Sequence, residues 1–224
     1  MDTKTIRKWL RKNASEKDRL GMIRFGIRCE KGYGVSIWKL RKLAKEIGKD
    51  HKLSMQLYKQ AEHEMKLLGC LVAEPDKMTE KQMDTIVRGF YSWDLCDQWC
   101  SNVLDKTPFA WKKAKEYARA DDEFVRRAGF VLMCTLAVHD KKRDDRDFLQ
   151  FFPSIRKYAF DERNFVKKAV NWAIRQIGKR SRFLNKEAVR LAKEVKKQDT
   201  KAARWIADGA LRELTSEKTV ARLK

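Results

Sequence analysis

Residues 123–132 have the sequence EFVRRAGFVL, and residues 164–173 have the similar sequence NFVKKAVNWA. The two segments begin 41 positions apart, and in both a basic pair precedes small and apolar residues at helical spacing. A weaker third copy, AARWIADGAL, occupies residues 202–211, about 37 positions further on. Periods near 40 residues in a helical chain are typical of HEAT-like repeats, in which helix pairs stack into a superhelix. The segments therefore predict an all-α superhelical solenoid.

The rest of the chain agrees with this prediction, because apolar residues recur at helical spacing and no alternating Val/Ile/Thr-rich stretch indicates a strand. Residues 64–71 (EMKLLGCL) resemble a degenerate earlier copy, so we expect one HEAT-like domain over residues 1–224. The alternative is an ordinary helical bundle in which amphipathic helices resemble one another by chance. We predict helices at about 4–12, 16–30, 36–48, 51–73, 79–89, 92–105, 109–119, 122–138, 145–158, 162–178, 184–197 and 200–214.

The chain is strongly basic, with 52 Lys and Arg against 31 Asp and Glu, a net charge of +21. Residues 163–224 hold 18 Lys and Arg against 6 Asp and Glu, so this quarter carries more than half of the excess. Such an excess is usually tolerated for a polyanionic partner, although a solvated basic face without a partner is the alternative. If the repeats stack, a concave basic face that follows a phosphate backbone is formed by Arg126, Arg127, Lys167, Lys168 and Arg204.

Several other classes of protein fit poorly. No apolar run has the length of a signal peptide or a membrane span, and the basic residues are not backed by one exposed apolar helix. Five cysteines, an odd number, indicate reduced thiols in the cytoplasm. We expect the protein to be associated with the bacterial nucleoid. His63-Glu64 begins like a zinc-protease helix but has Leu67 where a second histidine is needed, and no phosphate loop is present. We expect no metal and no cofactor.

The segment Trp93-Asp94-Leu95-Cys96-Asp97 is the strongest candidate for chemistry. Trp93 and Asp97 are four residues apart, so both project from one face of a helix. A phosphate-binding surface normally avoids carboxylates, and an aspartate there indicates a positively charged target. The plainer interpretation is that Asp97 caps or salt-bridges a neighbouring repeat while Trp93 fills the core.

This segment resembles the W-D-x-x-D motif of the AlkD-like DNA glycosylases, a family of HEAT-repeat enzymes. Residues 124–128 (FVRRA) resemble the later helix in which that family has an arginine, and residues 169–172 (AVNW) resemble the helix with its second tryptophan. The motifs come in the family order, and the resemblance extends over residues 18–214.

The resemblance implies a role for each matching residue. Asp97 is the catalytic carboxylate, Trp93 and Trp172 contact the lesion deoxyribose, and Arg127 contacts the DNA backbone. The family's N-terminal tyrosine aligns with Phe25, which keeps the ring for packing against DNA but loses the hydroxyl; Tyr33 is a nearby candidate to replace it.

The implied activity is hydrolysis of the N-glycosidic bond of N3- or N7-alkylated purines in duplex DNA, by a monomer and without base flipping. An alkylated purine is already cationic, so it leaves without a general acid while Asp97 stabilises the charge that develops on the sugar. Two alternatives remain: a basic helical-repeat protein that binds DNA or RNA without chemistry, and a HEAT scaffold that binds proteins.

Overall fold

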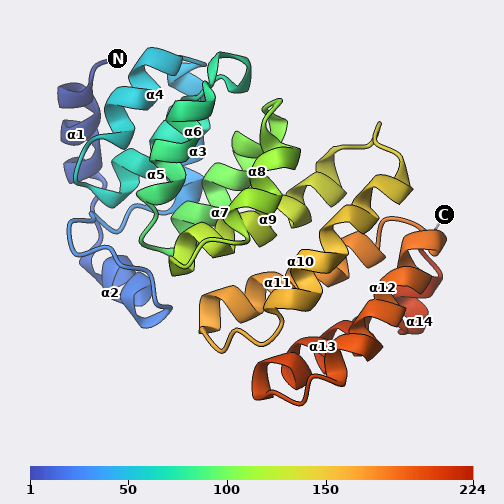
Figure 1. Ribbon diagram of the computed structural model, residues 1–224. Coiled ribbons are helices and arrows are strands. Elements are labelled where there is room, and N and C mark those ends of the chain that lie inside the picture. Colours follow the sequence, from blue (N-terminus) through green and yellow to red (C-terminus); the bar gives the residue numbers. More distant parts are fainter. Residues whose placement is uncertain (224) are drawn as a thin grey trace. The chain divides into compact units, whose positions relative to one another are not determined.

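The computed structural model describes residues 1–223, and this part of the chain is all α-helical with short 3₁₀ segments and no strand, as predicted (Figure 1). It divides into two compact units, residues 1–107 and the chain from Pro108 onward. None of the helices in the described residues is both long and apolar enough to cross a membrane. The first unit contains α1 (Thr3–Lys12), α2 (Glu16–Arg24), α3 (Ile37–Ile47), α4 (His51–Tyr58), α5 (His63–Val72), η1 (Pro75–Lys77), α6 (Glu80–Arg88), α7 (Trp93–Asn102) and η2 (Leu104–Lys106).

The second unit consists of stacked helix pairs, as the repeated segments predict. Helices α9, α11 and α13 pack side by side in that order, with α8 against α9 and α12 against α11 and α13 (Figure 1). The two strongest sequence copies begin α9 and α11, and the third lies within α13. The bounds are α8 (Ala110–Tyr117), α9 (Glu123–His139), η3 (Asp145–Phe151), α10 (Phe152–Tyr158), α11 (Asn164–Gly178), α12 (Arg182–Lys196), α13 (Lys201–Leu214) and α14 (Glu217–Val220).

The predicted helix over 51–73 is wrong, because the chain forms two helices, α4 and α5, that fold back against each other. The contact is close: the Ser54 hydroxyl donates to the Gly69 carbonyl at 2.7 Å, and a Cβ on Gly69 would lie 3.2 Å from the Ser54 carbonyl oxygen. Folding back buries Leu57 and Leu68 completely, which one straight helix would not achieve with the same partners.

Two more predicted helices differ from the structure for local reasons. The helix predicted over 145–158 begins as the 3₁₀ segment η3, and α10 starts with Pro153 in its first turn, where the missing N–H costs no helical hydrogen bond. The helix predicted over 16–30 ends at Arg24, since Gly26 adopts φ = +76°, a left-handed conformation that stops a helix.

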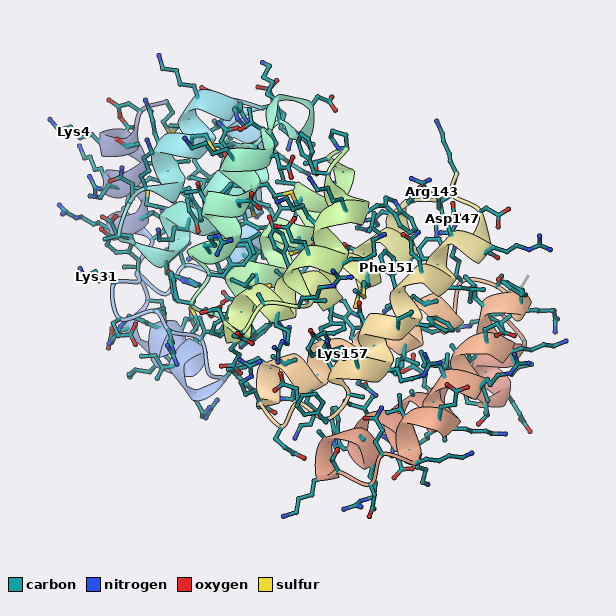
Figure 2. All side chains as sticks on the ribbon, in the orientation of Figure 1. Lys4, Lys31, Arg143, Asp147, Phe151 and Lys157 are labelled. Carbon is teal, nitrogen blue, oxygen red and sulfur yellow. The ribbon has the colours of Figure 1, made fainter. Side chains whose placement is uncertain are left out.

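An aromatic cluster fixes the connection that follows α9. Trp111 of α8 stacks on Phe151 with ring centroids 4.9 Å apart, and its indole N–H donates to Asp140 at 3.0 Å. The Arg143 guanidinium covers the same indole at 4.6 Å and lies 3.6 Å from Asp147; Figure 2 labels Phe151 and this pair at one end of the unit. The cluster accounts for a tryptophan that has no part in the predicted site.

Candidate functional site

The helix α7 begins at Trp93 and presents Trp93 and Asp97 one turn apart, as the spacing predicts. Both residues are half-buried. The Trp93 indole N–H donates to the carbonyl oxygen of Phe25 at 3.1 Å, so the edge of this ring is fixed by the backbone that follows α2. The Ser101 hydroxyl donates to the Asp97 carbonyl at 2.7 Å and leaves the helix intact.

Phe25 occupies the C-cap of α2, and a Schellman turn holds it there. The Ile27 N–H donates to the Met22 carbonyl at 3.1 Å and the Gly26 N–H donates to the Ile23 carbonyl at 2.9 Å. The Phe25 ring is 69% exposed, and the Arg24 guanidinium lies 5.6 Å from its centroid. The turn therefore points one carbonyl at Trp93 and leaves the aromatic ring in solvent.

Phe25 and Trp93 line one open groove of about 950 Å³ in the first unit. Exposed apolar side chains border it, with Leu20 at 54% exposure, and Lys17 and Arg24 supply positive charge. Tyr33 does not line the groove. The groove residues are Lys17, Asp18, Leu20, Gly21, Met22, Arg24, Phe25, Ile27, Gly34, Ser36 and Trp93.

A buried polar network lies under the start of α7, and the sequence patterns do not predict it. Asp94 bonds the buried His63 ring at 2.8 Å and accepts the Ser92 hydroxyl, while the second His63 nitrogen lies 3.0 Å from the Tyr91 hydroxyl. Burial alone would raise the pKa of Asp94, but the His63 and Ser92 hydrogen bonds outweigh it and hold the pKa below its ordinary value. The network anchors the residue next to Trp93. The histidine at 63 was the signal, because a lone buried histidine needs partners.

The neighbouring Glu64 holds the loop that leads into α3. Its carboxylate is fully buried and accepts the backbone N–H groups of Tyr33, Gly34 and Val35 at 2.7–3.1 Å. Gly34 has φ = +72°, and a Cβ there would lie 2.0 Å from the Ser15 carbonyl oxygen. His63 and Glu64, the zinc-protease-like pair, therefore have structural roles. Each side chain forms hydrogen bonds with a segment beside the groove.

In the second unit, Trp172 lines a cavity of about 620 Å³ together with Arg127 and Lys168. Trp172 is half-buried and Lys168 is exposed. Arg127 is only 5% exposed, and its guanidinium donates to the Phe165 carbonyl at 2.7 Å, which joins α9 to the first turn of α11. The cavity residues are Arg127, Lys168, Asn171, Trp172, Arg175, Trp205, Asp208, Gly209, Arg212 and Glu213.

The structure does not place all the predicted cations on one track. Arg126 is 7% exposed, and its guanidinium bonds Asp161 at 2.6 Å and the Ala120 carbonyl at 2.7 Å, so the fold itself uses this side chain. The helical period explains the correction, since the side chains of neighbouring residues point about 100° apart and only one of the pair 126–127 reaches the cavity. Arg204 is exposed but pairs with Asp199 and does not line the cavity.

Other residues of the cavity were missed as site residues. Trp205 lines the cavity with 46% of its surface exposed, and the ammonium of Lys167, a predicted DNA-binding residue that does not line the cavity, lies 5.4 Å from the centroid of its ring. Arg175 and Arg212 also line it. The available signal was the repeat itself, because extending the alignment by one turn brings these two arginines into equivalent positions.

Comparison with known proteins places the chain in a family. Residues 6–214 match the family model described as DNA alkylation repair enzyme. Among solved structures, the chain is similar to one described as "a new family of proteins related to the HEAT-like repeat DNA glycosylases with affinity for branched DNA structures", with a TM-score of 0.79 and 22% identity over 96% of each chain. At that identity the likeness shows a shared fold. No curated protein matched the chain by sequence. Because the family model covers nearly the whole chain, the protein belongs to the DNA alkylation repair enzyme family, as the W-D-x-x-D resemblance indicates.

Proposed function

We propose that the protein is a DNA glycosylase that hydrolyses the N-glycosidic bond of N3- or N7-alkylated purines in duplex DNA. The observation that carries the proposal is the pair Trp93 and Asp97, one turn apart at the start of α7 in a protein of net charge +21. A carboxylate beside an aromatic ring is unfavourable for phosphate contacts but suits a cationic sugar. Family membership supports the same reaction class.

The proposed reaction needs only one acid–base group. The bond between C1′ of the deoxyribose and the purine nitrogen breaks, and its electron pair leaves with the base, which neutralises the positive charge of the alkylated ring. Asp97 stabilises the charge that develops on the sugar and accepts a proton from the water whose oxygen attacks C1′. The products are a free alkylpurine and an abasic site.

The aromatic residues assist the same charge separation. Trp93 and Trp172 offer electron-rich faces to the cationic sugar, each worth about 0.5–2 kcal/mol by analogy with cation–π contacts. The Trp93 ring is held for this role by its bond to the Phe25 carbonyl, which needs no phenolic hydroxyl at position 25. Phe25 then packs against the DNA with its exposed ring.

We further propose that the helix pairs build a superhelix whose concave face binds DNA as a monomer, with the damaged base still stacked. Within the second unit, Lys168 supplies an exposed positive charge at the cavity and Arg127 reaches its wall. Lys167 on α11 and Arg204 on α13 add to the local positive potential. Arg126 is excluded from the DNA contacts because Asp161 holds it.

A second candidate function is binding of branched DNA without catalysis. It is favoured by the structural neighbour, whose family is described as related to the glycosylases with affinity for branched DNA structures. Asp97 discriminates between the two functions, because a carboxylate repels phosphate and a pure DNA-binding protein would gain affinity from asparagine at this position.

The deciding experiment is release of methylpurine from methylated duplex DNA. We expect the wild type to release base, Asp97→Asn to lose activity by about 100-fold or more, and Trp172→Ala to lose about 2- to 30-fold. Glu46→Gln and Trp38→Ala are matched controls, because both side chains are exposed on α3 and line neither the groove nor the cavity. Absence of base release by the wild type, or full activity of a folded Asp97→Asn variant, would refute the glycosylase proposal.

A further inference from the structure

Trp205 is an exposed tryptophan on a helix that is otherwise well packed. Ala203, Ile206 and Ala210 on α13 are fully buried, whereas Trp205 keeps 46% of its surface in solvent and lines the cavity with Trp172. Among the described residues, no other aromatic ring packs against Trp205; the Lys167 ammonium lies over it at 5.4 Å. An indole left open to a cavity is an unused stacking surface.

The repeat register shows what this indole replaces. Arg127 on α9 and Lys168 on α11 are 41 positions apart, and Trp205 follows Lys168 by 37. This offset is the one that aligns the buried face of α11 with that of α13, because it pairs Ala169 with Ile206 and Ala173 with Ala210, all fully buried. These three equivalent positions, on three adjacent helices, line one cavity. Two repeats therefore present a cation where the third presents an aromatic ring.

One helical turn further along, the aromatic ring is on α11 and the equivalent position of α13 is a glycine. The same offset of 37 pairs Arg175 with Arg212 and Trp172 with Gly209, and all four line the cavity. The two tryptophans thus lie one turn out of register on neighbouring helices. Where α11 has its indole, α13 has no side chain.

Close packing between α11 and α13 fixes this register. The Asn171 amide donates to the Ile206 carbonyl at 2.8 Å, and a Cβ on Gly209 would lie 2.9 Å from the same amide nitrogen. A larger residue at 209 would displace the Asn171 amide from its hydrogen bond to the Ile206 carbonyl. The cavity beside Trp205 is therefore a consequence of how the two helices meet.

The charges at the cavity suit an anion with an attached ring. Glu213 is engaged by Arg175 at 2.5 Å and by Lys179 at 2.6 Å, and Asp208 is engaged by Lys196 at 2.8 Å. By contrast, Lys168 and Arg212 are exposed and form no ion pair within residues 1–223.

We propose that this cavity binds an unpaired nucleotide of the DNA, with the base stacked on Trp205 and its phosphate held by Lys168 and Arg212. Nucleotides without sequence preference are bound in this way, by aromatic rings for the bases and cations for the backbone. The inference rests on the proposed DNA binding but not on glycosylase activity. It also leaves the damaged base in the stack, because the unpaired nucleotide lies at a bulge, a gap or a branch.

The test compares affinity for two unmethylated duplexes that differ by a single-nucleotide bulge, measured by fluorescence anisotropy at one salt concentration. We expect the wild type to prefer the bulged duplex by about 5- to 100-fold, the range that stacking of one base on an aromatic ring supplies. Trp205→Ala should lose this preference and Trp205→Phe should keep most of it. Trp38→Ala is the control, since Trp38 is 70% exposed and lies outside the cavity.

Trp205→Lys separates a lost stacking surface from a lost fold. This variant restores the residue type of position 168, so it should abolish the preference for the bulge while matched-duplex affinity stays equal or rises. Equal affinity of the wild type for both duplexes, or an undiminished preference in a folded Trp205→Ala variant, would overturn the inference. A preference for the bulge without any release of methylpurine would leave the inference standing and remove only the glycosylase activity.

Discussion

Removal of Arg126 tests whether its positive charge stabilises the fold or contacts DNA. As a member of a basic pair it is a natural candidate for a phosphate contact, yet its guanidinium is buried against Asp161 at 2.6 Å. It also donates to the Ala120 carbonyl at 2.7 Å and lies 4.5 Å from the centroid of the Tyr158 ring. We therefore predict that Arg126→Ala changes stability and leaves DNA contacts unchanged.

The expected loss in the free energy of unfolding depends on the hydrogen bonds that Asp161 keeps when Arg126 is removed. Breaking a buried ion pair from one side usually costs about 3–5 kcal/mol, because the other charge stays buried without its partner. Asp161 keeps three bonds from Arg163, two from the guanidinium at 2.9 and 2.6 Å and one from the backbone N–H at 3.1 Å, so we expect a smaller loss of about 2–4 kcal/mol. For a chain of this length that corresponds to a fall in Tm of about 5–15 °C.

The assay combines urea unfolding with the salt dependence of binding to duplex DNA. Arg126→Ala should unfold at lower urea and keep the wild-type slope of log affinity against log salt concentration. Lys168→Ala is the matched control, because this side chain is exposed at the cavity: it should keep wild-type stability and reduce the slope by about 0.9, the value of one phosphate contact. A double-mutant cycle of Arg126→Ala with Asp161→Asn should give a coupling of about 1–3 kcal/mol.

A structural role for Arg126 would be refuted if Arg126→Ala is as stable as the wild type, or if it lowers the salt slope as much as Lys168→Ala does. Either result would mean that Arg126 leaves Asp161 to meet phosphate.

Gly34→Ala should destabilise the protein by about 2 kcal/mol or more and speed hydrogen exchange at the Arg19 N–H, because φ is +72° and the new Cβ would lie 2.0 Å from the Ser15 carbonyl oxygen that accepts this N–H; an unchanged urea midpoint would contradict this. The lowered pKa of Asp94 contributes stability that is fully present above the ordinary aspartate pKa of 3.8 and is lost as pH falls through the lowered pKa of the folded state, so Asp94→Asn should lower the urea midpoint more at pH 7 than at acidic pH below 3.8; an equal loss at both would be inconsistent with the His63 bond. Affinity for duplex DNA should fall by about 10³ or more between 50 and 200 mM salt, and a flat profile would argue against a phosphate-binding surface.

Much of the fold could be predicted because two independent patterns agree. The helical spacing of apolar residues gives the class, and the repeat at 123–132 and 164–173 gives the pairing of helices. The largest error lies where packing between helices decides the outcome. The break between α4 and α5 depends on the approach of Ser54 to Gly69, which no local propensity reports.

For the candidate site, spacing predicts geometry only within one helix, and the family resemblance supplies Trp172, Arg127 and Phe25. Spacing alone places Trp93 and Asp97 on one face of α7, and the structure keeps that arrangement. Spacing cannot show that His63 and Asp94 bond beneath the helix, because their contact joins residues 31 positions apart. It also cannot tell Arg126 from Arg127, since the choice depends on where Asp161 lies.

The repeats place equivalent side chains of successive helices beside one another, so each residue can be compared with its equivalents. In a solenoid, equivalent residues of successive repeats form rows, so a substitution in one repeat changes the row at one place only. The row through Arg127 and Lys168 changes to an indole at Trp205, and the next row changes from Trp172 to Gly209. If the row followed a uniform phosphate backbone, a third cation would serve it best. An aromatic ring at the end of the row instead matches a DNA strand whose regular stacking ends there, which is why bulged and branched DNA are the informative ligands for this cavity.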